Sequence, residues 1–277
     1  MAVHRDQASA VERPTAVDRH LDGWDSPFAA GRATRWQRPV RVFELDPGLL
    51  DGVEPHLARI ARQRVVAESV VLATGPWTPP QRDELGRDAV GLLVLDGLLM
   101  RSLAFDGLLS PELFGVGDVL RPWESDELLD FEVTAEWRVL ERATVALLDA
   151  EFARQVCRIP GVTAALLARA IQRSRSLAFR IAVAHIRRAE PRVLTLFWHL
   201  GDRWGTVTPR GVAVPLRLSH SMIASLVYMR RSTVSAVLTR LARAGELERN
   251  ADGSWLITGE RPALTGITRR TPPPRAA

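Results

Sequence analysis

The order of short elements over residues 212–258 constrains this 277-residue chain more than any other feature. The segment begins with a predicted short strand over 212–216 that contains β-branched valines. Pro215 in this strand suits a position at the edge of a sheet. A short helix over 220–226 follows, for which Ser219 is a good N-cap. A second helix over 231–244 leads to two short segments, 246–249 and 254–258, and an Asn-Ala-Asp-Gly turn joins these as in a β-hairpin. Strand, helix, turn, helix and hairpin in this order predict a winged helix-turn-helix.

The second of these helices is amphipathic and has a cationic N-terminal end. Apolar residues recur at helical spacing from Val234 and are predicted to pack inward. Arg231 and Ser232 open the opposite face, where long donors can reach base edges in the major groove of DNA. We therefore predict a double-stranded DNA partner, with base contacts from Arg231, Ser232 and next Ser235. Further DNA contacts, mostly to phosphates, are predicted for Ser219, Ser221, Arg230, Thr233, Thr239, Arg240 and Arg243.

The charge of the chain is concentrated in the same region. Ten arginines face only four acidic residues from Arg217 onward, whereas the whole chain has a net charge of +5, so the preceding residues are close to neutral. A basic module on a neutral body suits a partner that carries phosphates. Two alternatives remain open from the pattern alone, namely a solvated basic surface and a protein-interaction module that does not bind DNA.

The first half of the chain has a different pattern. Short apolar segments over 36–158 are separated by turn sequences such as Asp96-Gly97 and Asp106-Gly107, which predicts an antiparallel barrel or sandwich. Separate strands are expected near residues 40–43, 65–72, 90–95, 98–105, 137–140 and 144–148. The first 35 residues are polar and rich in turn formers and are expected to form a flexible arm, and residues 261–277 a disordered tail.

A long helix is predicted between these two regions, within residues 159–190. No Gly or Pro occurs from Val162 to Arg188, and small or apolar residues recur with a seven-residue period. A seam this narrow favours pairing with a second copy of the chain, and packing on the chain's own barrel is the alternative. Pro191 is expected to end the helix, and a further helix is expected to begin at Val193. The predicted dimer residues are Leu167, Ile171, Ser174, Ala178, Ile181 and His185.

Taken together, these elements resemble the cyclic-AMP receptor/FNR (Crp/Fnr) family of bacterial transcription regulators. The resemblance is strongest over 192–257, where 214–219 leads into the first helix and 231–235 opens the second, and 113–118 looks like the turn before the family's ligand cassette. The resemblance implies an α+β fold with an N-terminal cyclic-nucleotide-binding-like β-roll, a dimerisation helix and a C-terminal winged helix-turn-helix over 191–260. It also implies a homodimer on a near-palindromic operator, an effector that moves the DNA-binding heads, and RNA polymerase as a further partner.

The chain departs from the family pattern at several positions. Nucleotide-binding members carry a Gly-Glu pair and an Arg-Ser/Thr-Ala segment after the turn, and neither is present here. Arg121 and Trp123 remain as candidate effector residues, and we expect control by something other than an ordinary cyclic nucleotide. A regulator that does respond to cyclic nucleotides is the alternative. Tyr228 replaces the usual glycine of the helix-turn-helix, where a positive φ would cost about 1 kcal/mol.

Several other classes of protein find no support in the sequence. No nucleophile–base pattern, P-loop or dinucleotide motif is present, so no catalytic residue and no enzyme activity are predicted. One cysteine cannot ligate an iron–sulfur cluster, and the six histidines leave haem open without a clear ligand pair. No metal site or cofactor is predicted and the effector is unassigned. With no apolar run of about 18 residues and no signal segment, we expect a cytoplasmic protein without a membrane partner.

Overall fold

The structure is a computed structural model that describes residues 38–85, 88–105, 108–124 and 134–262. The predicted arm over 1–35, the predicted Asp106-Gly107 turn and nearly all of the predicted tail lie outside these ranges. Among the helices of the described ranges, none combines the length and the hydropathy that crossing a membrane requires.

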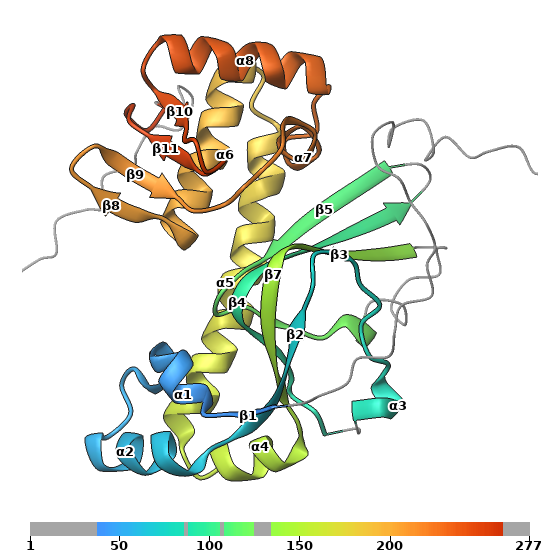
Figure 1. The fold of residues 1–277 in the computed structure, drawn as a ribbon, viewed down its shortest axis with the longest axis vertical. Coiled ribbons are helices and arrows are strands. Elements are labelled where there is room, and N and C mark those ends of the chain that lie inside the picture. The colour runs from blue at the N-terminus through green and yellow to red at the C-terminus, as the bar shows by residue number, and fades with distance from the viewer. Residues whose placement is uncertain (1–37, 86–87, 106–107, 125–133, 263–277) are drawn as a thin grey trace, which may run out of the picture.

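The first half of the described chain is an antiparallel sheet that curls into a β-roll (Figure 1). Its strand order is β1-β2-β7-β4-β5, with β3 beside β7 and β6 beside β4. Apolar side chains from β2, β4, β5 and β7 fill the inside of the roll, among them Leu92, Phe114 and Trp137. The strands are β1 (Arg38–Val40), β2 (Ala67–Leu72), β3 (Gly75–Pro76), β4 (Gly91–Phe105), β5 (Leu108–Phe114), β6 (Val119–Leu120) and β7 (Thr134–Leu148).

The long strands β4 and β7 correct two predictions. Asp96-Gly97 is not a turn between two strands, because β4 continues through it with shifts of register against β7. Gly97 has a φ of +84°, and a Cβ at this position would lie 2.3 Å from the Arg142 carbonyl oxygen. The predicted strands at 137–140 and 144–148 are likewise parts of the single strand β7. A β-bulge bends a strand without ending it, and a Gly-containing dipeptide looks the same in either role.

Short helices close one end of the roll. Val42 and Phe43 were expected in the first strand, but they lie in α1. Both are fully buried, and Phe43 packs 6.3 Å from the Phe152 ring, whereas consecutive strand residues would point to opposite faces. The short helices are α1 (Val42–Leu45), η1 (Pro47–Leu50), α2 (Pro55–Arg64), α3 (Arg82–Leu85), η2 (Pro122–Glu124) and α4 (Ala150–Val156).

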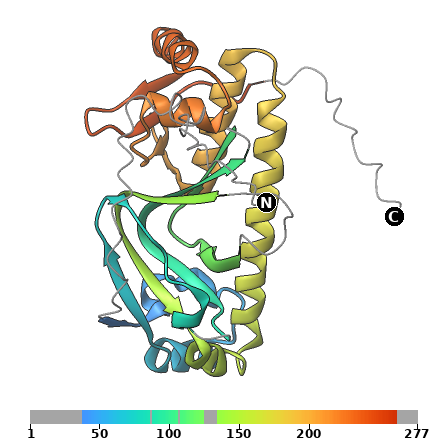
Figure 2. The same ribbon diagram turned by 90° about the vertical axis from the view of Figure 1, so that its right-hand side faces the viewer.

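Helix α5 (Pro160–Ala184) runs along one edge of the whole molecule, with the roll and the C-terminal module on the same side of it (Figure 2). Its 25 residues extend over about 37 Å. It ends at Ala184, before Pro191, which instead lies in the first turn of α6 (Ala189–Trp204). A helix tolerates proline there because the first backbone N–H groups have no partner within the helix.

The predicted order of the C-terminal module is confirmed. β9 (Gly211–Val214), α7 (His220–Leu226), α8 (Arg231–Arg243) and the hairpin of β10 (Leu247–Arg249) and β11 (Trp255–Ile257) follow one another. The sequence did not reveal β8 (Thr206–Thr208), which pairs with β9 in the sheet order β10-β11-β9-β8. Because β9 is therefore an inner strand, Pro215 is not on an edge but lies just after the strand ends.

The C-terminal module and the β-roll share one hydrophobic core. Buried side chains of α6, α7, α8 and the hairpin pack together with Leu98, Met100 and Leu113 of the roll. Within the module, the Phe197 and Trp255 rings lie 4.9 Å apart. In this conformation the module is thus docked on β4 and β5.

Candidate DNA-binding interface and sensor cavity

The first helix of the motif, α7, is fixed at its N-terminus and along its inner face. The Ser219 hydroxyl accepts a hydrogen bond from the Met222 backbone N–H at 3.2 Å, as a capping serine does. Ile223 and Ala224 are buried in the common core, and the small side chain of Ala224 leaves room for a second helix to cross closely. Helix α7 therefore forms a fixed support for α8.

The turn between α7 and α8 is docked on the roll. Tyr228 has a φ of 53°, the only positive value at a non-glycine residue of the described chain. Its hydroxyl lies 3.1 Å from the Ser110 Oγ of β5, and the Arg180 guanidinium of α5 lies beside it. The strain of about 1 kcal/mol expected for this backbone conformation is offset by contacts that a glycine could not make.

Helix α8 lies at one end of the molecule (Figure 1). Its four apolar residues from Val234 to Leu241 are buried in the common core. On the other side Arg231, Ser232 and Thr233 are exposed at the N-terminal end of the helix. This places a guanidinium group and two hydroxyl groups where an entering helix meets base edges.

Other residues predicted to contact DNA are engaged within the protein. The hydroxyl of the half-buried Ser235 lies 2.9 Å from the His220 Nδ1, and the Thr239 hydroxyl donates to the Ser235 carbonyl at 3.0 Å. Arg240 forms an ion pair with Glu190 of α6. The remaining predicted contact residues are the half-buried Ser221 and the exposed Ser219, Arg230, Arg231, Ser232, Thr233 and Arg243.

Two arginines beside the hairpin were missing from the predicted contacts. A Cβ on Gly253 in the hairpin turn would lie 3.7 Å from Arg217 Cγ and 3.8 Å from Arg249 Nη2, so both side chains lie against the wing. Burial, together with the positive charges of Arg249 and Arg231, lowers the pKa of His220. The start of α8, the start of α7 and the wing thus form one basic surface. Net charge indicated this surface, but only the folded hairpin shows which arginines belong to it.

Five of the predicted dimer residues lie on the outer face of α5, and His185 is the residue that directly follows the helix. The structure places all six in exposed positions, with 62% of Ile181 and 61% of Leu167 accessible. The opposite face of the helix is different in character, because Arg169, Arg173 and Arg180 there bond to the roll. The seam is formed by Leu167, Ile171, Ser174, Ala178, Ile181 and His185.

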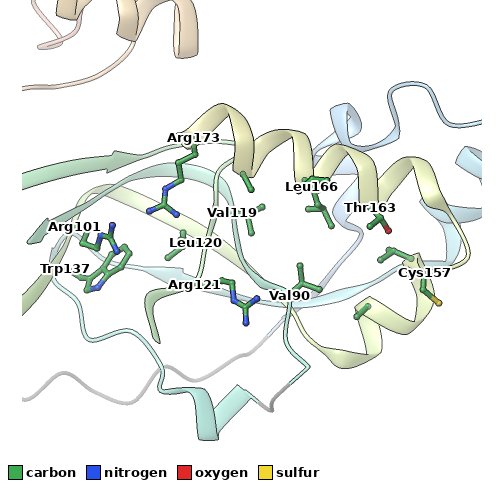
Figure 3. A pocket seen from close by; sticks show the side chains of 14 residues that line it. Val90, Arg101, Val119, Leu120, Arg121, Trp137, Cys157, Thr163, Leu166 and Arg173 are labelled. Atoms are coloured by element: carbon green, nitrogen blue, oxygen red, sulfur yellow. The ribbon is translucent and has the colours of Figure 1, made fainter. Parts of the chain in front are cut away.

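A cavity of about 720 Å³ lies between the roll, α4 and α5 (Figure 3). Its lining is mostly aliphatic and includes Val119, Leu166 and one aromatic ring, that of Trp137. Three guanidinium groups from Arg101, Arg121 and Arg173 also line it, and none of the described lining residues is acidic. Such a lining combines apolar surface with positive charge.

The structure brings only one of the two candidate effector residues into this cavity. Arg121 lines it, whereas Trp123 is outside the lining and lies with its ring 5.8 Å from the Arg121 guanidinium. Sequence reasoning missed Arg101 and Arg173. Arg101 precedes the turn in the sequence, but the pairing of β4 with β5 and β7 brings it beside the cavity.

Arg101 and Arg173 share one carboxylate. Glu112 of β5 accepts from Arg101 Nη2 at 2.8 Å, from Arg173 Nε at 2.8 Å and from Arg173 Nη2 at 3.0 Å. Its side chain is only 8% exposed. Burial alone would raise the pKa of Glu112, but the hydrogen bond and charge of Arg173, with the charges of Arg101 and Arg180, lower it below the usual value. Glu112 is therefore an ionised, buried counter-ion.

A comparison with protein families identifies the C-terminal module. Residues 191–266 match the model of the Crp-like helix-turn-helix domain. This range contains α6 from its third residue onward, the four-stranded sheet, α7 and α8. No curated protein matches the sequence.

Solved structures share the fold of the wider chain. A mutant of CooA from Carboxydothermus hydrogenoformans is 18% identical, with a TM-score of 0.54 over 81% of this chain and 94% of that chain. A cyclic nucleotide-binding domain containing protein from Listeria monocytogenes is 15% identical, with a TM-score of 0.54 over 69% of this chain and 89% of that chain. The β-roll, the long helix and the winged helix-turn-helix thus occur together in known structures.

Proposed function

From its Crp-like helix-turn-helix domain on the fold of the Crp/Fnr regulators, which are transcription factors and not enzymes, we propose that this chain binds double-stranded DNA as a homodimer. The observation that carries the proposal is the exposed N-terminal end of α8, which Arg230 and Arg231 open, while Arg231 and Arg249 of the wing both lie close enough to His220 to lower its pKa. A protein-interaction module would not need cations gathered around the end of one exposed helix.

Individual roles follow from exposure and partners. Arg231 and Ser232 contact bases, because they are exposed at the start of α8 and no element of the described chain covers them. Ser235 is a weaker candidate than the sequence indicated, since its hydroxyl is held by His220. Contacts with the DNA backbone are assigned to eight further residues, namely Arg230, Arg243, Ser219, Ser221, Thr233, Thr239, Arg217 and Arg249. Arg240 makes such a contact only when its ion pair with Glu190 is broken.

A homodimer would present two such helices to the two halves of a near-palindromic operator. The six exposed seam residues of α5 support this arrangement, because an exposed apolar stripe at heptad spacing is typical of a coiled-coil contact. Leu167 and Ala170 also line the cavity, so a partner helix would pass close to a bound effector. RNA polymerase is a further proposed partner.

The proposed effector is not an ordinary cyclic nucleotide. The segment after the Gly115–Asp118 turn continues as β6 and η2 and brings a single arginine, Arg121, to the cavity. The Gly-Glu pair and the Arg-Ser/Thr-Ala segment of nucleotide-binding relatives have no counterpart in its sequence. Calorimetry with cyclic AMP and cyclic GMP separates this proposal from a nucleotide-responsive regulator.

Selection of bound sequences from random duplex DNA tests DNA binding and supplies the operator. On that operator, Arg231→Ala should relax the preference at one base position by about 1–3 kcal/mol, whereas Arg243→Ala should weaken binding to all sequences alike. Arg158→Ala is the matched control, because Arg158 is exposed and lies between α4 and α5, at the end of the molecule opposite α8 (Figure 1). Absence of any selected or retarded DNA at about 50 mM salt would overturn the DNA-binding proposal.

A further inference from the structure

The cavity beside α5 has an unusual internal charge arrangement. Arg101 and Arg173 both line it, and both are already bonded to Glu112, which is not among the lining residues. The two guanidinium groups therefore face the cavity on one side and a buried carboxylate on the other. Among the described lining residues three are arginines and none is acidic, so positive charge lines a largely apolar space.

We propose that the cavity binds a small organic anion with an apolar body, such as a carboxylate, and that its charged group takes over Arg101 and Arg173 from Glu112. Arg–carboxylate pairs favour a bidentate geometry, and a ligand carboxylate offers the same two oxygens that Glu112 now offers. The aliphatic lining and the Trp137 ring accommodate the apolar body. A nucleotide, which is polar over most of its surface, fits this lining less well.

Glu112 links such a ligand to the DNA-binding module. It follows Pro111 and Ser110 on β5, and these two residues contact the module and the long helix: the Pro111 carbonyl accepts from Arg180, and the Ser110 hydroxyl meets Tyr228 in the turn before α8. Arg173 and Arg180 are separated by two turns on the same face of α5. Release of Glu112 from its arginines thus loosens the strand on which the helix-turn-helix is docked.

This proposal rests on the proposed function only for the effect of the ligand on the DNA-binding module. Ligand binding itself is therefore measured without DNA. The probes are 1-anilinonaphthalene-8-sulfonate, an apolar fluorescent anion, and octanoate as its competitor, with octanol as the neutral match of octanoate. Octanoate should displace the fluorescent probe at concentrations at least about tenfold below those that octanol needs, because only the anion forms charge-assisted hydrogen bonds. Equal potency of octanoate and octanol would show an apolar cavity without an anion site and would overturn the proposal.

Variants test the exchange of carboxylates. Arg173→Gln should weaken octanoate binding about tenfold, whereas Glu112→Gln should strengthen it about tenfold, because the Glu112 carboxylate then no longer competes with the ligand for these guanidinium groups. Arg175→Gln, an exposed arginine on the same helix, should leave binding unchanged. Thermal unfolding verifies that each variant is folded. A folded Glu112→Gln protein with unchanged or weaker octanoate binding contradicts the exchange.

Hydrogen–deuterium exchange of the unmodified protein keeps the test independent of variants that do not fold. Octanoate should increase amide exchange in 110–114 and in the turn at 227–230 while slowing it around the cavity. Unchanged exchange in both segments, at saturating octanoate, would overturn the link to the DNA-binding module. Selective DNA binding that persists alongside these negative results would leave the proposed function intact and remove only this inference.

Discussion

His199 of α6 is a histidine that the fold keeps neutral. Its ring lies 4.8 Å from the Phe179 ring of α5, at the junction between the long helix and the C-terminal module. Burial first, and then the positive charges of Arg203 and Arg180, lower the pKa of His199 from 6.5 to about 4, while Asp202 acts in the opposite direction. The neutral imidazole is favoured here, because α5 and α6 bring cations and apolar surface around it.

Stability should therefore fall in mildly acidic solution. The unfolded chain takes up the His199 proton near pH 6.5 and the folded chain only near pH 4, so the contribution of neutral His199 is complete above pH 6.5 and is lost as the pH falls toward 4. The loss amounts to about 3 kcal/mol at most. Urea unfolding from pH 7 to pH 4 measures it, and His199→Gln should flatten the profile over this range.

The exposed His56→Gln variant serves as the control, since the His56 side chain on α2 is not enclosed by the fold. Parallel pH profiles for the unmodified protein and His199→Gln would rule out the assignment to His199.

Among the structural elements, β4 shows how a strand bends without ending. Its pairing with β7 shifts register between Val94 and Leu99, and Gly97 sits at the bend with φ +84°. The backbone of Arg142 and Ala143 passes so close that any Cβ at Gly97 would collide with it. Because of the bend, one end of β4 contributes side chains to the inside of the roll. Its other end contributes side chains to the core shared with the DNA-binding module.

Gly97→Ala should destabilise the protein by about 2–4 kcal/mol, because the substitution adds a backbone clash to the strain of a positive φ. Gly52→Ala is the matched control, since Gly52 has a similar φ of +76° with nothing within 4 Å of a Cβ. The control should cost only about 1 kcal/mol. Denaturant unfolding measures the free energy of unfolding of both variants. Equal losses of this free energy would contradict the prediction, because they would mean that the backbone near Gly97 moves away from a new Cβ at little cost.

The two faces of helix α5 carry different kinds of side chain. The inner face carries arginines that bond to the roll, with Arg169 on Asp46 and the Gly117 carbonyl, Arg173 on Glu112 and Arg180 on Pro111. The outer face carries the small and apolar seam. The arginines of the inner face and the seam residues of the outer face both recur at heptad spacing. A conformational change at the cavity therefore acts on the same helix that is proposed to pair with a second copy.

At the scale of the whole molecule, the exposed seam should decide the oligomeric state. Ile181→Glu, at a position 62% exposed in the single chain, should convert a dimer to a monomer, because two like charges would face each other across the two-fold axis. Sedimentation equilibrium measures the mass, and circular dichroism verifies the fold.

Val71→Glu is the matched control, because Val71 is also an exposed apolar residue, 46% accessible, but lies on β2 away from the seam. It should leave the mass unchanged. A chain that is monomeric before any substitution, at concentrations well above those used for DNA binding, would refute the proposed dimer.

The sequence by itself determined the elements whose physics is local. Helical periodicity with a Ser219 cap and a glycine after α8 predicted the winged helix-turn-helix, and the heptad spacing predicted a long helix with an exposed seam, because capping and amphipathicity act within a few residues. The tertiary structure alone decided what depends on distant strands. The bulge at Gly97, the pairing of Arg101 and Arg173 with Glu112, and the docking of Tyr228 on Ser110 join residues far apart in the chain, and no local pattern specifies such register or burial.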